Sequence, residues 1–585
     1  MPTPFEGEIF TILNPDSSEL MLRGWGNQFV AVFETLDGFT VTQAADGYYE
    51  YARLAEDGES LVPSGVRVGA ADPQTLGLPR HARITRAASM RSAEAAQDAL
   101  GPVPRWMQRR AENLERRIAR PPAGLPSAGP EATEGPGAAP PPATTTGDYL
   151  GLVLLVDFSD FPATISRQEV DDFCNKPGYS GFGNNGSAFD YYRDVSDGKL
   201  RYKNHVAAYY RAKHPRTYYT DPAVAYGTRA QELIREALDS LVAGGFDFSA
   251  LTADYAGFIR ALSVFYAGVR SNAWSQGLWP HSWSLATSYA VPGGRRFSDY
   301  QITDLGNQLT LRTFCHENGH MICDFPDLYD YDAVNVGNGI GDYSLMCFGG
   351  SDKNPTQVEA YLKHAAGWAS RVTTLTSGMT ATLESGKNDF ALHARNAQEY
   401  FILENRQQTG RDASLPDAGI AIWHCDVKGN NSFEQMTPAQ HYECSLEQAD
   451  NRFDLERRVN RGDAEDLYGG AAAAFGPGTA PNSAWWDAST SGLDIDQISA
   501  VGASMTVRTR ATGAQTYANL GVDMVFATHH AQNGWVSLSG LGWRKIQTGA
   551  ADGVTNMLTT FALAKARNLK VTVRADPATV FQAYL

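Results

Sequence analysis

The sequence predicts a multidomain α+β protein with β-rich regions at both ends and a mixed helical and stranded region between them. Three observations lead to this prediction. A chain of 585 residues is too long for one hydrophobic core and divides into several domains of ordinary size. Apolar and polar residues alternate near both ends, as they do in half-buried strands. A Pro/Ala/Gly-rich stretch at residues 121–146 separates the first unit from the rest.

The composition is that of globular protein, and the charge disfavours some classes of partner. Hydrophobic residues make up 43% of the chain and aromatic residues 11%. A net charge of -16 would repel nucleic acid and anionic membranes, so we expect neither as a partner. No apolar run approaches the roughly 20 residues of a transmembrane segment. Residues 1–8 have neither the basic nor the apolar region of a signal peptide.

Residues 1–120 form the first predicted domain, a β-rich unit followed by a basic helix. Up to about residue 75, alternating segments such as residues 29–35 are broken by turns. Residues 88–120 have helix-forming composition with a basic end, which contains Arg105, Arg109, Arg110, Arg116, Arg117 and Arg120. Residues 121–146 cannot bury enough apolar surface to fold, so we expect an exposed linker there, either a tether open to an activating protease or a simple spacer.

Residues 147–372 are the predicted catalytic domain, and its central stretch has the pattern His-Glu-x-x-His. His316 and His320 are four residues apart, so one face of a helix can present both rings to one metal ion at ~2.0 to 2.1 Å. Glu317 lies one position round the helix, where its carboxylate can take a proton from water and pass it to a leaving amine. This combination predicts the active-site helix of a zinc peptidase.

A third metal ligand is expected shortly after this helix. Pro326 disfavours helix for the residue before it, so the helix should end near Asp324 and the chain should turn back. That turn favours Asp327 as the third ligand, with Asp324 as the competitor. Residues 341–346 form a tight turn that ends in Met346, like the Met-turn beneath metzincin metal sites, and we expect Met346 to pack there without binding metal.

Weaker candidates surround this motif. Tyr329 and Tyr343 are candidate oxyanion stabilisers, because such a group is required on physical grounds. His281 lies between tryptophans and either lines the substrate cleft or is a packed, hydrogen-bonded residue. A glycine-rich loop either binds calcium or is a turn held by Asx hydrogen bonds; its candidate calcium ligands are Asp330, Asp332, Asn335 and Asn338.

Cysteine usage leaves two alternatives open. The six cysteines are too few for a disulfide scaffold but permit three bridges. A bridge that braces the metal site and buried free thiols are both compatible with their positions, which are Cys174, Cys315, Cys323, Cys347, Cys425 and Cys444.

The rest of the chain reads as strands and turns. Residues 373–512 form a β-rich region with long apolar runs, and residues 513–585 form a small β module of unassigned role that either binds substrate, tethers the protein to a surface or caps the structure.

The motif resembles that of a known family. Residues 316–332, HENGHMICDFPDLYDYD, are similar to the motif of the immune inhibitor A family of secreted bacterial zinc metallopeptidases, although Cys323-Asp324 stands where the family has glycine, with one residue inserted. Residues 398–406 and 419–426 also resemble segments that follow the family's catalytic core, and the similarity covers most of residues 1–510. It implies a metzincin-like catalytic domain, an N-terminal pro-domain, a secreted or extracellular location, and calcium in acidic loops. Asp450, Asp463 and Asp466 are either ligands in such a loop or solvated turn residues.

These observations predict a zinc-dependent endopeptidase that acts on proteins or peptides and is made as a zymogen. Zinc would be held by His316, His320 and Asp327. One alternative is a gluzincin-like peptidase with Glu359 as the third ligand. Another is a binding or adhesion protein whose metallopeptidase domain is structural. No cysteine precedes Cys174, so a pro-region would block the site with a carboxylate, a backbone carbonyl or simple obstruction.

Overall fold

The three-dimensional structure is a computed structural model of the whole chain. The residues that it describes are 4–119, 145–270, 273–331, 337–431, 436–470, 473–511, 513–529, 533–547, 552–576 and 578–585. The predicted linker therefore lies almost entirely outside the described residues.

The chain begins with a six-stranded antiparallel sheet in which each strand pairs with the next. This arrangement confirms the β-rich N-terminal unit. Its apolar side buries a phenylalanine cluster, with Phe10 packed edge-on against Phe5 and Phe33. The strands are β1 (Phe5–Leu13), β2 (Glu19–Gly26), β3 (Ala31–Thr35), β4 (Thr40–Gln43), β5 (Tyr49–Leu54) and β6 (Leu61–Arg67).

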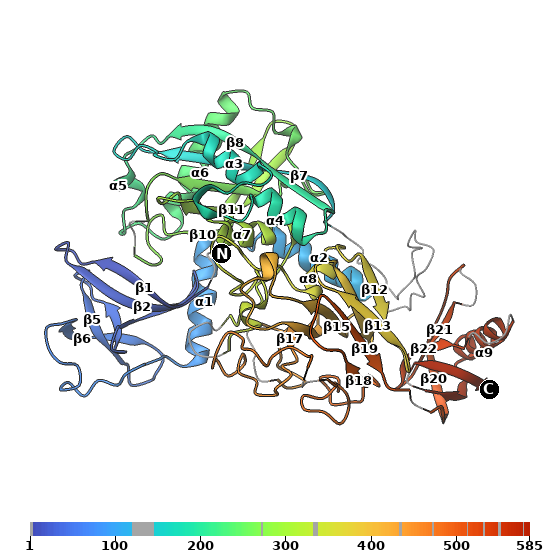
Figure 1. Ribbon diagram of the computed structural model, residues 1–585. Coiled ribbons are helices and arrows are strands. Elements are labelled where there is room, and N and C mark those ends of the chain that lie inside the picture. The colour runs from blue at the N-terminus through green and yellow to red at the C-terminus, as the bar shows by residue number, and fades with distance from the viewer. Residues whose placement is uncertain are drawn as a thin grey trace.

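Two helices connect this sheet to the rest of the molecule. α1 (Arg86–Leu100) begins where the Thr85 side chain accepts a hydrogen bond from the backbone N–H of Ala88, and it runs between the N-terminal sheet and the central domain (Figure 1). α2 (Arg105–Ala119) follows after a short turn and lies against the central domain. The predicted basic helix is therefore two helices, of which the second carries the arginine run.

The central domain is built on a five-stranded sheet of order β10-β11-β9-β7-β8. Only the edge pair β10–β11 is antiparallel, whereas the other neighbours are parallel. Residues 151–157 are buried, as the apolar run that precedes Asp157 predicts for a central strand. The strands are β7 (Gly147–Asp157), β8 (Leu200–Arg211), β9 (Leu262–Tyr266), β10 (His281–Val291) and β11 (Arg295–Asp304).

Helices pack around this sheet and continue its core. α4 starts with a capping box between Ser187 and Asp190. The helices of this domain are α3 (Arg167–Asn175), α4 (Ala188–Val195), α5 (Arg216–Tyr219), α6 (Thr228–Ala243), α7 (Leu311–Cys323) and α8 (Ala360–Ala365).

A second five-stranded sheet, of order β12-β14-β15-β16-β17, packs on the central domain, and a three-stranded sheet, β13-β19-β18, lies beside it. β15 and β16 are buried along their whole length. The strands are β12 (Arg371–Thr374), β13 (Thr380–Glu384), β14 (Asp389–Ala394), β15 (Glu399–Arg406), β16 (Gly419–Asp426), β17 (Cys444–Leu446), β18 (Ile495–Ile498) and β19 (Ser504–Thr509).

The C-terminal module is a small closed barrel of order β20-β21-β22-β24-β23 with its own core. The sequence prediction of a β module missed one helix, α9, which packs on the barrel through the buried residues Val554, Phe561 and Ala564. The elements are β20 (Gln515–Ala527), β21 (Gly534–Leu538), β22 (Gly542–Ile546), α9 (Gly553–Arg567), β23 (Lys570–Ala575) and β24 (Thr579–Tyr584).

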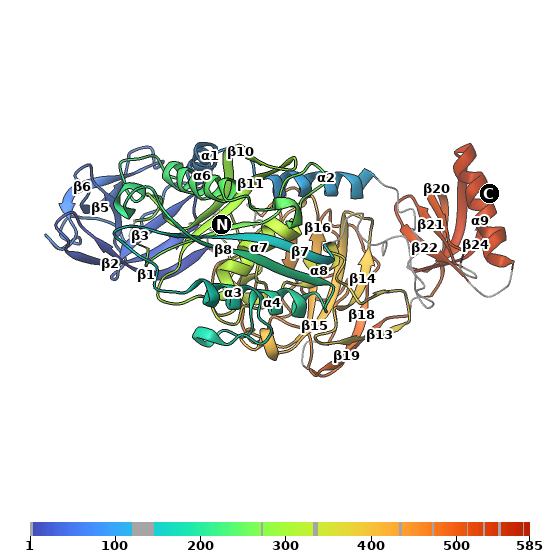
Figure 2. The same ribbon diagram turned by 90° about the horizontal axis from the view of Figure 1, so that it is seen from above.

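The protein is therefore multidomain and β-rich, as predicted. The N-terminal sheet and the C-terminal barrel lie at opposite ends of the molecule, with the central domain between them (Figures 1 and 2). Among the described residues, no helix combines the length and the apolar character needed to cross a membrane. All six cysteines are buried free thiols, so no disulfide braces the metal motif.

Candidate metal centre

The two motif histidines lie on the buried helix α7, and each is held by a backbone carbonyl. Nδ1 of His316 is 2.9 Å from the carbonyl oxygen of Leu345, and Nδ1 of His320 is 2.6 Å from that of Phe325. A carbonyl oxygen only accepts hydrogen bonds, so each Nδ1 carries the proton. In a neutral imidazole, Nε2 then presents a lone pair, which is the form that binds a metal.

Asp327 brings a third donor atom to these two nitrogens. Its Oδ1 lies 2.9 Å from Nε2 of His316 and 3.2 Å from Nε2 of His320, and the two nitrogens are 3.2 Å apart. Three lone-pair atoms that face one another at these distances repel unless a cation lies among them. Two histidines and one carboxylate are also a donor set that suits a divalent transition metal.

The protonation states agree with this reading. Burial lowers the pKa of His316 to about 4, although Asp327 opposes the shift, so the ring is neutral near pH 7. Burial alone would raise the pKa of Asp327, but the charge of His320 and His316 when they are protonated outweighs it and holds that pKa below its usual range. A neutral imidazole and an ionised carboxylate are the states in which these groups coordinate metal.

The end of α7 decides which aspartate reaches the site. Asp324 adopts the left-handed conformation with φ of 58° and ends the helix, as the following proline predicts. Its carboxylate pairs with Arg109, with Nη2 and Oδ1 2.7 Å apart, and so points away from the histidines. The turn then returns Asp327 to the helix, where the Asn431 side chain donates to the Asp327 carbonyl oxygen at 2.7 Å. Geometry therefore favours Asp327 over Asp324.

The turn that ends in Met346 packs against α7. Met346 is fully buried, and its Sδ would lie 2.9 Å from a Cβ placed on Gly319 of α7. The backbone N–H of Leu328 donates to the Met346 carbonyl oxygen at 2.7 Å, so the turn also supports the segment that carries Asp327. Gly339, with φ of 56°, allows the closest approach: a Cβ there would lie 1.9 Å from the Leu328 carbonyl oxygen.

The other sequence-predicted site residues divide into near and distant ones. Glu317 is buried on α7 beside His316. Tyr329 is buried two residues beyond Asp327, and burial, with the charge of Asp327, raises its pKa. Tyr343, in contrast, donates to Asp466 Oδ2 at 2.9 Å on the side of the second sheet.

His281 has a structural role. Its ring nitrogens contact the Trp279 carbonyl oxygen at 2.7 Å and the Tyr300 hydroxyl at 2.9 Å, and burial lowers its pKa to about 4. Of the two readings of this residue, the packed and hydrogen-bonded one is the one that the contacts support.

Among the described residues, Glu359, Asp330 and Asn338 do not belong to the group formed by His316, His320 and Asp327. The Glu359 side chain accepts a hydrogen bond from the backbone N–H of Leu362 and so caps α8, and burial raises its pKa to about 7. Asp330 accepts a hydrogen bond from the Tyr442 hydroxyl, and Asn338 donates to the Asn460 carbonyl oxygen. The other two loop candidates, Asp332 and Asn335, lie outside the described residues.

A separate acidic group does come together near the second sheet. Asp450, Asp463 and Asp466 each place a carboxylate oxygen within 4.8 Å of the others. Burial raises the pKa of Asp466 to about 7, and the negative charges of Asp463 and Asp450 act in the same direction.

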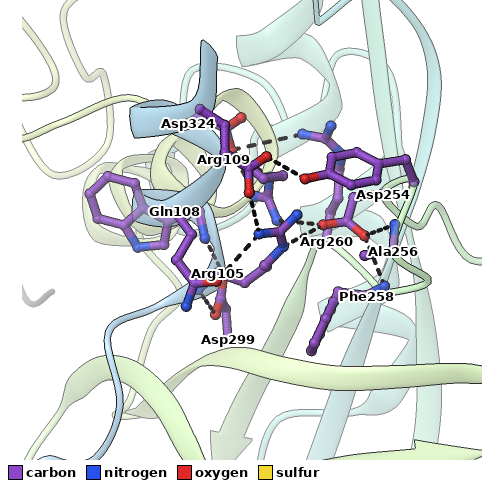
Figure 3. A network of polar contacts seen from close by, with 12 residues as sticks. Arg105, Gln108, Arg109, Asp254, Ala256, Phe258, Arg260, Asp299 and Asp324 are labelled. Carbon is purple, nitrogen blue, oxygen red and sulfur yellow. Dashed lines mark hydrogen bonds and ion pairs between the residues drawn. The ribbon is translucent and has the colours of Figure 1, made fainter. Parts of the chain in front are cut away.

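The structure adds residues that the sequence analysis did not connect with the site. Trp106 of α2 stacks on the His320 ring with a centroid distance of 4.7 Å and an interplanar angle of 22°. Arg109, one turn further along α2, donates to both Asp324 and the Met321 carbonyl oxygen (Figure 3). The only sequence signal was the arginine spacing at positions 105, 109 and 110, which places these side chains on one side of a helix.

Comparison with known proteins adds no further assignment. No protein-family model matches this chain, and no curated protein matches it at a significant level.

Replacing the two aspartates should separate the ligand from the helix cap. Asp327→Ala should weaken binding of a divalent transition metal more than about 100-fold, because it removes a direct donor, whereas loss of an outer group costs about 10- to 100-fold. Asp324→Ala should leave that affinity within a few-fold. Titration of the metal-depleted protein with Zn²⁺ against a competing chelator measures both, and a larger loss for Asp324→Ala would identify Asp324 as the ligand.

Gly339→Ala should perturb the centre without changing any donor. The new Cβ overlaps the Leu328 carbonyl oxygen, so the segment that carries Asp327 must move, and both thermal stability and metal affinity should fall. Gly470→Ala is a matched control: Gly470 has the same φ of 56° but nothing within 4 Å of a Cβ, so it reports backbone strain alone, about 1 to 2 kcal/mol. Equal effects of the two substitutions on metal affinity would show that the close approach does not position Asp327.

Proposed function

We propose that the protein is a zinc-dependent endopeptidase with a metzincin-like centre. The observation that carries this proposal is the convergence of His316 Nε2, His320 Nε2 and Asp327 Oδ1 beside the buried carboxylate of Glu317. The position of Met346 under α7 supports the metzincin-like assignment, and so does the resemblance of the motif to the immune inhibitor A family.

In this proposal the three donors hold zinc, which when bound would acidify a water molecule and polarise the scissile carbonyl. Glu317 accepts a proton from the attacking water and delivers it to the leaving amine. The carbonyls of Leu345 and Phe325 keep the two imidazoles in the tautomer and orientation that coordination requires. Tyr329, two residues beyond Asp327 in sequence, is the tyrosine that we propose as a positioning or oxyanion group, because Tyr343 donates to Asp466 instead.

We further propose that the intact chain is a zymogen. Trp106 covers one face of the His320 ring, and the donor groups are at most 1% exposed. The first unit also covers the outer edge of β10, where the Gln28 side-chain amide makes two hydrogen bonds to the backbone of Ser282. The obstruction is therefore an aromatic side chain together with an occupied strand edge, and no carboxylate from residues 4–119 joins the donor cluster.

The acidic group Asp450, Asp463 and Asp466 supports a secondary proposal of a structural calcium ion, because carboxylate oxygens are the ligands that calcium prefers. The gluzincin-like alternative finds no support in the geometry, since Glu359 caps α8. A binding or adhesion role stays open as the alternative that an activity measurement decides.

Glu317→Gln should keep zinc and lose peptide hydrolysis. The substitution leaves all three donors in place but removes the proton acceptor, so kcat should fall at least about 100-fold. Zinc content by atomic emission and hydrolysis of a quenched fluorescent peptide pool measure the two effects. An undiminished kcat in this variant would rule out Glu317 as the base.

Cutting the linker should raise activity. A site-specific protease sequence placed within residues 121–144 allows a single cut, after which Trp106 can leave His320. We expect hydrolysis of the peptide pool to increase by about tenfold or more as the uncut chain disappears, and Trp106→Ala should raise the activity of the uncut chain. The control is the natural chain exposed to the same protease. If the uncut and cut chains are equally active, residues 1–119 are a packing domain rather than an inhibitory one.

A further inference from the structure

The central domain and the second sheet, which together we call the central body, place four carboxylates around α2. We call these four carboxylates the acidic face. They come from separate segments, so only the fold brings them together: the loop before β9, strand β11, the end of α7 and the approach to β17. In that order they are Asp254, Asp299, Asp324 and Glu443. All four are buried beneath α2 in the intact chain.

Arginines of α2 pair with three of these carboxylates. Nε of Arg105 lies 2.8 Å from Asp254 Oδ2, and Nη2 of Arg109 lies 2.7 Å from Asp324 Oδ1 (Figure 3). Nη2 of Arg110 lies 2.7 Å from Glu443 Oε1 and 3.2 Å from the Tyr361 hydroxyl.

The fourth carboxylate binds the backbone of α2. The Asp299 oxygens accept hydrogen bonds from the backbone N–H groups of Arg105 and Trp106 at 2.6 and 2.9 Å. These are N–H groups of the first helical turn, which have no partner within the helix. The acidic face therefore recognises both basic side chains and the peptide backbone that carries them.

The central body supplies little positive charge of its own here. Among the described residues, the cation that it brings to Asp324 is Arg260, whose Nη1 is 3.8 Å from Oδ1. When α2 leaves, the acidic face loses three guanidinium groups, in a chain whose net charge is already -16. Clustered carboxylates that have lost their partners create a negative potential, which attracts a new cation.

The acidic face adjoins the proposed zinc site. Trp106, which stacks on His320, lies in sequence between the two arginines that pair with Asp254 and Asp324. Asp324 itself is four residues beyond His320. A polypeptide that crosses the metal centre would therefore place neighbouring side chains against these carboxylates.

We infer that the acidic face is a substrate subsite for basic residues, and that α2 fills it in the intact chain. The inference rests on the proposed peptidase function and adds the class of substrate: polypeptides with arginine close to the bond that is cut. Arginine should be preferred to lysine, because Arg109 uses its several donors to reach both the Asp324 carboxylate and the Met321 carbonyl oxygen.

The test uses the full chain with a single cut in the linker and two peptides that differ only in charge. One peptide has arginine near its centre and the other has glutamine at the same positions. We expect kcat/KM to be about tenfold higher for the arginine peptide, since hydrogen bonds to charged groups carry an effect of this size. Asp324→Asn should reduce this ratio about tenfold, and asparagine tolerates the left-handed conformation at this helix end.

Asp157→Asn is the matched control for charge. Asp157 is also a mostly buried aspartate of the central domain with an arginine partner, Arg211, but it lies outside the acidic face. This variant should leave the arginine-to-glutamine ratio unchanged. A ratio near one in the unmodified cut chain, or a ratio that Asp324→Asn leaves intact, would overturn the inference while leaving the peptidase proposal standing.

A second measurement needs no turnover. Fluorescence anisotropy of the two labelled peptides, with the cut Glu317→Gln chain, should show tighter binding of the arginine peptide and loss of that preference in the double variant with Asp324→Asn. If neither peptide is hydrolysed but this binding preference is found, the acidic face is supported and the peptidase proposal fails. Equal binding of the two peptides contradicts the acidic face whatever the activity.

Discussion

The proposed metal centre depends on one geometric constraint: a helix can offer two ligands four residues apart, but the third must return from beyond its end. Here the return is made in three residues, from Asp324 in the left-handed conformation to Asp327. So short a reversal needs support from outside. The Met346 carbonyl oxygen accepts from the backbone of Leu328, and Gly339 leaves room for that backbone to pass.

The second sheet is part of that support, so it is not an independent appendage. The Asn431 side chain, between β16 and β17, binds the carbonyl of Asp327 itself. Tyr343, beside the Met-turn, reaches Asp466, and the backbone N–H of Asp342 donates to the Arg461 carbonyl oxygen. The predicted catalytic domain ends at residue 372, and the predicted β-rich region follows it. Asp327 is nevertheless positioned by residues of both regions, because Met346 supports the neighbouring Leu328 and Asn431 binds the Asp327 carbonyl oxygen.

The parts of the site that could be predicted from sequence are those set by local spacing. The interval between His316 and His320, the helix end before Pro326 and the turn to Met346 each follow from a few adjacent residues, and the structure has all three. Contacts between distant segments leave no such trace, and the stacking of Trp106 on His320 joins positions more than 200 residues apart. Tyr343 and His281 were candidates for residue type alone, and their hydrogen bonds lead elsewhere. The helix α9 was missed because the strands around it dominate the pattern of that module.

The way α2 begins has a consequence for how its removal would proceed. Its first turn has no acidic residue of its own, and the groups at its start are satisfied by Asp299, which belongs to another domain. A helix of 15 residues is at the margin of stability in water, and α2 would lose its hydrogen bonds to Asp299 on release. The released segment would therefore lose its helical order, and any return would have to repay the entropy of folding as well as of binding. The conformational entropy that α2 gains on release would therefore oppose its return to the acidic face.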